Sequence, residues 1–210
     1  MSRAYLAALS MAFLFYWLRP IMRRGWVMWL GVQLAAAVVV EAAAVEQDGV
    51  PNHWLYNLYM FVEFLAITAM VSSLCPMHNR LRSWVPWSML PFTIAYLYDV
   101  NDSFDRLATD ALVIGGLMLL MMNAGLLVHE AATGERAFWY SPSAWLCLST
   151  IVYFGCAAPF MGVLHFLNNI DLNATNTLYA VNDMASIVRY LLIALCILLL
   201  PRRHRLAHDQ

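Results

Sequence analysis

Long apolar stretches separated by short polar ones run through the whole chain. A helix needs about 17–25 mostly apolar residues to cross a hydrocarbon core of about 30 Å. Seven stretches approach or meet this length, the first and fourth being the shortest: 4–19, 26–45, 54–75, 84–99, 107–129, 143–166 and 175–200. The pattern predicts an all-α polytopic membrane protein, with one seven-helix transmembrane bundle over residues 1–200 and a short basic tail over 201–210.

The composition supports a membrane class. Hydrophobic residues make up 62% of the chain and charged residues 12%, whereas soluble domains carry about 25% charged residues. We therefore expect the lipid bilayer as the main partner, and nothing indicates nucleic-acid binding. The chain has no lysine, so Schiff-base chemistry on lysine is excluded. The four cysteines are widely spaced without a Cys-x-x-Cys pair, which favours packing over a metal or redox role.

The arginines alternate between the two ends of the predicted helices. One set of ends holds Arg3 and Arg106 only. Apart from Arg189, which lies within the seventh stretch, the other set holds the remaining ones: Arg19, Arg23, Arg24, Arg80, Arg82, Arg136, Arg202, Arg203 and Arg205. Because arginine is enriched in cytoplasmic loops, this bias predicts an outer N-terminus and a cytoplasmic C-terminus. Asp and Glu residues gather at the predicted outer ends, with Glu41 near the outer end of its helix.

The third stretch carries polar residues on one face. At 100° per residue, Tyr56, Tyr59 and Glu63 fall within a sector of about 60°. Lipid cannot satisfy such a stripe, so it must face protein or water. In contrast, Gly115 and Gly116 in the fifth stretch predict close helix packing.

The seventh stretch shows a comparable polar face, with Tyr179 and Asp183 on it and Arg189 on its flank. Tyr153 and His165 belong to the sixth stretch. We expect all these side chains to meet in a polar pocket open to the outside and floored by Glu63, Asp183 and Arg189. The same acids and arginine would also serve as structural contacts between helices, and both interpretations stay open. No metal site and no particular cofactor is predicted.

Three phrases carry a resemblance: "NHWLYNLYMFVEF", "FWYSPSAWLCLSTIVYFG" and "VLHFLNNI". They resemble small bacterial seven-helix proteins that are similar to the N-terminal membrane sensor regions of histidine kinases. In that group an acidic residue follows an Asn- and Tyr-rich helix entry, here Glu63, and a Tyr-x-Gly precedes a histidine, here Tyr153 and His165. The resemblance implies a sensor or ligand-binding module. Since no kinase follows in this sequence, signalling would require a separate partner.

Two alternative functions follow from the same residues. The helix number and the intramembrane acids and histidines resemble metal-dependent lipid hydrolases related to alkaline ceramidase and the progestin/adiponectin receptors. That family has paired histidines on its last helix, and the last helix here has none. A proton- or ion-coupled transporter would also use acids at mid-membrane depth, although the sequence shows no inverted repeat. The leading expectation is a sensor that binds a small molecule or ion from the outer side.

Overall fold

The computed structural model describes residues 3–21, 25–46, 52–75, 80–102, 106–133, 138–167 and 172–201. All regular structure within these ranges is helical. The elements in chain order are α1 (Arg3–Leu18), α2 (Trp26–Glu46), α3 (His53–Leu74), α4 (Arg80–Trp84), η1 (Pro86–Ser88), α5 (Met89–Asp102), α6 (Thr109–Thr133), η2 (Phe138–Tyr140), α7 (Pro142–Leu167) and α8 (Leu172–Leu199). The all-α prediction is confirmed.

Each of the seven predicted stretches coincides with one long helix, from α1 to α3 and from α5 to α8. Five helical stretches of the described chain are long and apolar enough to cross a membrane: α2, α3, α6, the Pro142–Phe160 part of α7 and the Tyr179–Leu199 part of α8. The other two are shorter, with 16 residues in α1 and 14 in α5. However, α4 and η1 lead almost directly into α5, which makes a longer helical path from Arg80 to Asp102.

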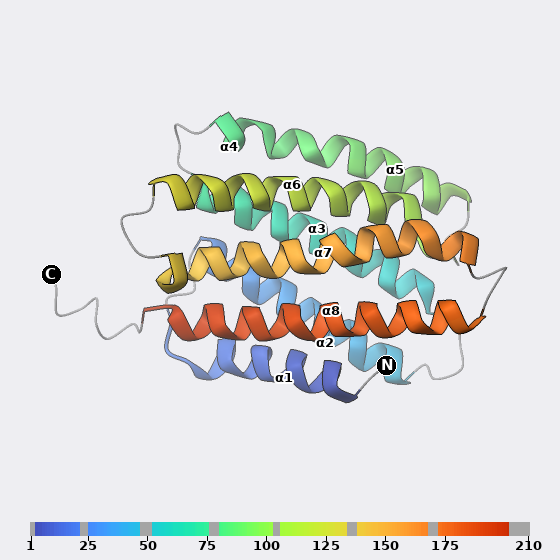
Figure 1. The fold of residues 1–210 in the computed structure, drawn as a ribbon, viewed down its shortest axis with the longest axis horizontal. Coiled ribbons are helices and arrows are strands. Elements are labelled where there is room, and N and C mark those ends of the chain that lie inside the picture. Colours follow the sequence, from blue (N-terminus) through green and yellow to red (C-terminus); the bar gives the residue numbers. More distant parts are fainter. Residues whose placement is uncertain are drawn as a thin grey trace, which may run out of the picture.

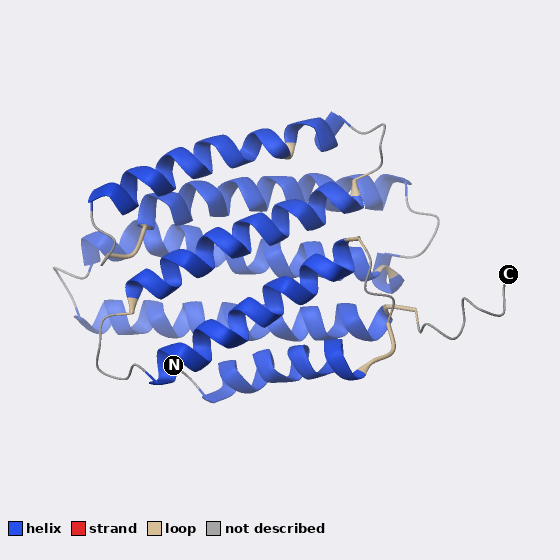
Figure 2. Ribbon diagram, turned by 180° about the vertical axis from the view of Figure 1, so that it is seen from behind, coloured by secondary structure: helices blue, strands red, loops and turns tan. Residues whose placement is uncertain are grey.

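Six of the helices close a ring around a common interior. Each of α1, α2, α3, α6, α7 and α8 packs against the next, and α8 returns to α1. Figure 1 shows α8 beside α1 and α7, and Figure 2 shows α2 and α3 covering the opposite face. Helix α5 lies outside this ring against α6. Because neighbouring helices surround the interior on every side, polar side chains on their inner faces are kept away from lipid.

The outer surface of the helices is apolar, as lipid contact requires. Large hydrophobic side chains are exposed on α5, where Ile94 is 61% and Leu97 60% exposed, and on α6, where Met121 is 71% exposed. Trp84 and Trp87 are also exposed next to α5, a position that suits tryptophan at a membrane–water interface. The surface therefore agrees with the multi-pass membrane character that the composition indicates.

Polar contacts tie the helix ends together. Arg19, after α1, donates from Nη1 to the carbonyl of Ile197 in α8 at 2.7 Å. At the opposite end, the Asn57 amide of α3 donates to the carbonyl of Arg106 at 2.7 Å and accepts from the backbone N–H of Ala108 at 2.9 Å. These bonds satisfy backbone groups where the chain leaves helical structure. They hold α3 and α6 in register, which positions the residues deeper in the bundle.

Glycines bring α6 close to its neighbours, as predicted. A Cβ atom on Gly115 would stand 2.7 Å from Phe92 of α5 and 3.2 Å from Phe64 of α3. The rings of Phe64 and Phe92 stack with their centroids 3.9 Å apart. A side chain at position 115 would therefore force the two aromatic rings apart and move α6 away from the interior of the helix bundle.

Candidate functional site

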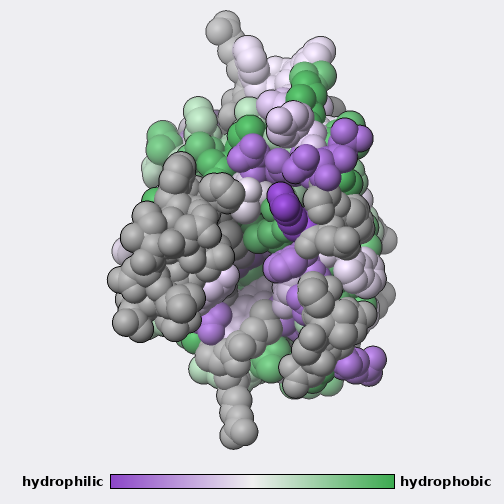
Figure 3. All heavy atoms as spheres, turned by 90° about the vertical axis from the view of Figure 1, so that its right-hand side faces the viewer, coloured by the Kyte–Doolittle hydropathy of each residue, from purple (hydrophilic) through white to green (hydrophobic). Residues whose placement is uncertain are grey.

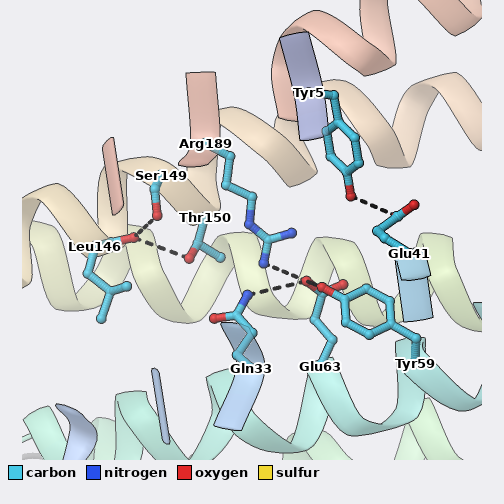
Figure 4. A network of polar contacts seen from close by, with 9 residues as sticks. All are labelled: Tyr5, Gln33, Glu41, Tyr59, Glu63, Leu146, Ser149, Thr150 and Arg189. Carbon is cyan, nitrogen blue, oxygen red and sulfur yellow. Dashed lines mark hydrogen bonds and ion pairs between the residues drawn. The ribbon is translucent and has the colours of Figure 1, made fainter. Parts of the chain in front are cut away.

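An ion pair between α3 and α8 forms the centre of the buried polar cluster. Arg189 Nη2 lies 2.5 Å from Glu63 Oε1, and the two residues are only 2% and 5% exposed. Figure 4 shows both side chains reaching toward each other across the bundle interior. Burying an unpaired charge in a medium of low dielectric constant costs much free energy. The opposite charge of each group lowers this cost for the other group.

Two neutral side chains also donate to the Glu63 carboxylate. Gln33 of α2 donates from Nε2 to Oε1 at 3.3 Å, and the Tyr59 hydroxyl donates to the same oxygen at 3.0 Å. Tyr59 lies one turn before Glu63 on α3, where side chains four residues apart meet. The carboxylate thus receives one charged and two neutral partners, from three helices.

Aromatic rings surround the Arg189 guanidinium. Its central carbon lies 4.3 Å from the centroid of the Tyr153 ring in α7. The rings of Phe154 and Tyr190 follow at 5.6 Å and 5.8 Å. A cation within about 6 Å of a ring centroid is attracted by the ring quadrupole. These rings cover the arginine and contribute to keeping its charge inside the bundle.

The donors of Arg189 are nevertheless incompletely used. A guanidinium carries five N–H donors, and the contact with Glu63 involves Nη2. The Nε–H group is buried and has no hydrogen-bond partner, and Nη2 contacts Glu63 as an ion pair without hydrogen-bond geometry. Nearby, the hydroxyls of Ser149 and Thr150 donate to the carbonyl of Leu146 within α7 (Figure 4). A buried donor without an acceptor costs about 1–3 kcal/mol, so the cluster lacks at least one acceptor.

A second buried carboxyl group lies closer to the end of α2. Glu41 is 5% exposed, and its Oε1 accepts a hydrogen bond from the Tyr5 hydroxyl of α1 at 2.9 Å. The Tyr5 ring meets the Tyr190 ring edge-on, with centroids 5.7 Å apart. Tyr190 therefore lies between the Glu41 group and the Arg189 group. Figure 4 shows the Tyr5–Glu41 pair beside the Glu63–Arg189 cluster.

The space beside Glu63 is small. A cavity of about 10 Å³ adjoins Glu63 and is otherwise lined by apolar and aromatic residues such as Met60, Phe64 and Leu119. This is about the volume that a single water molecule needs. A larger molecule would therefore require α3, α6 or α7 to move.

The end of the bundle at which α3 begins and α2 ends is more polar. Figure 3 looks onto this end and shows hydrophilic residues beside a hollow. This is the end that the arginine bias predicts to face outward. A polar opening at one end and a buried polar cluster below it are the features that a ligand entering from this side would need.

The structure brings four of the predicted site residues together: Tyr59, Glu63, Tyr153 and Arg189. Tyr56 is half-buried, and it lies close enough to Glu41 for the Glu41 charge to act on it.

The remaining predicted residues lie elsewhere. Asp183 is half-buried, and its charge acts on Glu41. Six residues of α8, about 9 Å of rise, separate it from Arg189. Tyr179 is 51% exposed and its ring meets Phe160 edge-on at 5.7 Å. The side chain of His165 lies outside the described residues.

Two residues of the cluster were missed by sequence reasoning, Gln33 and Tyr5. Gln33 is the single amide in the otherwise apolar first half of α2, and an intramembrane polar residue of this kind is a usable signal. Tyr5 carries no such signal, because a tyrosine near a helix end is also typical of a membrane interface. Only the packing of α1 against α2 and α8 brings its hydroxyl to Glu41.

Metal chemistry gains no support from this geometry. Within the described side chains, no three His, Cys, Asp or Glu residues converge as metal ligands would. The polar groups that do converge are an arginine, an amide, tyrosines and single carboxylates, which suit hydrogen bonding and charge pairing. The chain matches no protein-family model, no curated protein and no solved structure.

Proposed function

We propose that this protein is a membrane sensor module in which a small molecule or ion from the outer side acts on the Glu63–Arg189 pair. In this proposal all seven long helices cross a bacterial cytoplasmic membrane, with the N-terminus outside and the C-terminus in the cytoplasm. The arginine bias supports this orientation. The joint path of α4, η1 and α5, 23 residues from Arg80 to Asp102, supports a span despite the short α5.

The observation that carries the proposal is the incomplete hydrogen bonding of Arg189. A buried pair that only holds helices together is expected to have its polar groups satisfied, because each missing bond costs free energy. Here Arg189 is 2% exposed and its Nε–H has no acceptor. A ligand that offers a hydrogen-bond acceptor to this Nε–H group would remove the free-energy cost of the missing bond. Its binding would be favoured by that amount.

The position of the pair connects binding to helix movement. Glu63 belongs to α3 and Arg189 to α8, which do not follow each other around the ring of helices. A ligand that binds one partner weakens or reorients the ion pair, and so shifts the balance between two arrangements of these helices. Both helices reach the predicted cytoplasmic end, where a separate signalling partner would detect the change.

A ligand screen on the detergent-purified chain tests this proposal. Ligands that raise the unfolding temperature are then tested by hydrogen–deuterium exchange, which should change along α3 and α8. Glu63→Gln should abolish this change because the amide cannot hold the ion pair. Glu46→Gln makes the same replacement at an exposed position at the end of α2 and should leave the response intact. An unchanged response in Glu63→Gln contradicts the proposal.

A further inference from the structure

The carboxyl group of Glu41 has a partner for only one of its two oxygens. Tyr5 donates to Oε1 at 2.9 Å, whereas Oε2 is buried and has no hydrogen-bond partner. The residue is 5% exposed. Among the described residues, no Lys, Arg or His forms an ion pair with it. This differs from Glu63, whose charge Arg189 balances at 2.5 Å.

A second acid makes the negative charge at this level larger. Asp183 of α8 lies close enough for its charge to act on Glu41. The positive N-terminal amino group of the chain also acts on Glu41, but Oε2 still has no hydrogen-bond partner. Without a donor at this oxygen, the buried carboxyl group favours its neutral, protonated form.

We propose that Glu41, with Asp183, forms a binding subsite for the ammonium group of a small protonated amine that enters from the outer side. The inference rests on the proposed function and deepens it by naming the chemical class of the ligand, an amine whose remaining part carries the hydrogen-bond acceptor for the Arg189 Nε–H group. The ammonium N–H groups would donate to Glu41 Oε2, the oxygen that has no partner, and the positive charge would balance the Glu41 carboxylate.

The surroundings favour an ammonium group over a metal ion. Tyr5 lies against Glu41, Tyr190 against Tyr5, and Tyr56 within reach of the Glu41 charge. Aromatic faces attract an organic cation, whereas alkali and alkaline-earth ions require several oxygen ligands. No group of three metal-binding side chains converges in the described part of the chain.

The subsite lies near the polar end of the bundle. Glu41 is five residues from the end of α2 at Glu46, about 7.5 Å of helix rise. It is eight residues, about 12 Å, further toward that end than Gln33, which bonds to Glu63. The hollow in Figure 3 opens at the same end. An amine would therefore meet Glu41 before the Glu63–Arg189 pair, with Tyr190 between the two.

Methylammonium chloride is the probe for this subsite. The full chain, purified in detergent, is unfolded by heat at pH 7 with increasing methylammonium, and with sodium chloride at equal ionic strength. Methylammonium should raise the unfolding temperature saturably and sodium should not. Glu41→Gln should weaken the apparent affinity about thirtyfold or more, because one partner of a buried charge pair is lost. Glu46→Gln should not change it, and Asp183→Asn should weaken it less.

Proton release provides a measurement that needs no variant. If unliganded Glu41 is protonated, methylammonium displaces that proton, and calorimetry in two buffers of different ionisation enthalpy should detect the release. An equal response to sodium, no response to methylammonium, or unaltered binding in Glu41→Gln each overturns the subsite.

A different result would contradict the proposed sensor function and leave the Glu41 subsite unaffected. The sensor function fails if the screened ligands that raise the unfolding temperature change the exchange of α3 and α8 equally in the wild type and in Glu63→Gln. The subsite alone fails if other ligands produce that response through Glu63 while Glu41→Gln has no effect on any of them.

Discussion

The two buried glutamates of this bundle differ in how their charge is balanced. Both are 5% exposed, and each accepts a tyrosine hydroxyl at about the same distance, 3.0 Å from Tyr59 and 2.9 Å from Tyr5. Glu63 also has Arg189 and Gln33 as partners, whereas Glu41 has a buried oxygen without one. Burial alone therefore does not define the state of a carboxyl group. The deeper group has an arginine as its counterion, whereas the outer one forms no ion pair with a side chain of the described residues.

The largest effect is expected from Glu63→Leu. This change leaves Arg189 buried without a counterion, and arginine cannot become neutral by losing its proton. Breaking a buried pair in this way costs about 3–5 kcal/mol. The free energy of unfolding in mixtures of detergent and SDS measures it. Asp110→Leu removes a carboxyl at an exposed position of α6 and serves as the control. A loss as small as the control's would show that Glu63 does not carry the balancing charge.

Arg189→Met should cost less than Glu63→Leu, about 2–3 kcal/mol, because the unpaired Glu63 can take up a proton while an unpaired arginine cannot lose one. The double variant Glu63→Leu/Arg189→Met should recover most of the lost stability, since apolar residues often replace a buried ion pair without penalty. Both are measured by the same unfolding assay. Additive losses in the double variant would contradict a direct pairing of the two charges.

Tyr59→Phe and Tyr5→Phe compare the two glutamates through the same chemical change. A hydrogen bond to a charged group contributes about 1.5–3 kcal/mol and one between neutral groups about 0.5–1.5 kcal/mol. In the absence of an amine, Tyr59→Phe should therefore reduce the free energy of unfolding more than Tyr5→Phe does. Equal losses would indicate that Glu41 and Glu63 have the same ionisation state.

Glu41→Gln should have the smallest effect on the unliganded protein, within about 0.5 kcal/mol of the wild type. An amide resembles a protonated carboxyl in size, and Tyr5 can still donate to its oxygen. Exposed substitutions such as Glu46→Gln usually stay within about the same limit, so the two variants should unfold alike without ligand. A loss of several kcal/mol would mean that Glu41 is ionised and paired in the unliganded protein.

Sequence reasoning located the helices and one side of the candidate site. The stripe of α3 follows from a period of 3.6 residues, and the structure places Tyr59 and Glu63 on the buried face. The sequence pattern could not decide whether Glu63 or Asp183 pairs with Arg189. Both acids lie on polar faces of their helices, and a helical period does not give the orientation of one helix relative to another. In the structure, the ion pair joins Arg189 to Glu63.

The sequence by itself determined that the chain forms long apolar helices and that the polar face of α3 must avoid lipid. Both follow from local physics, because backbone groups in a bilayer need helical hydrogen bonds and polar side chains cannot be satisfied by hydrocarbon. Only the tertiary structure decided that α8 packs against α1, that Tyr5 reaches Glu41 and that Gln33 reaches Glu63. These contacts depend on the order and rotation of helices around the ring, which side-chain packing across the whole bundle determines and no single segment encodes.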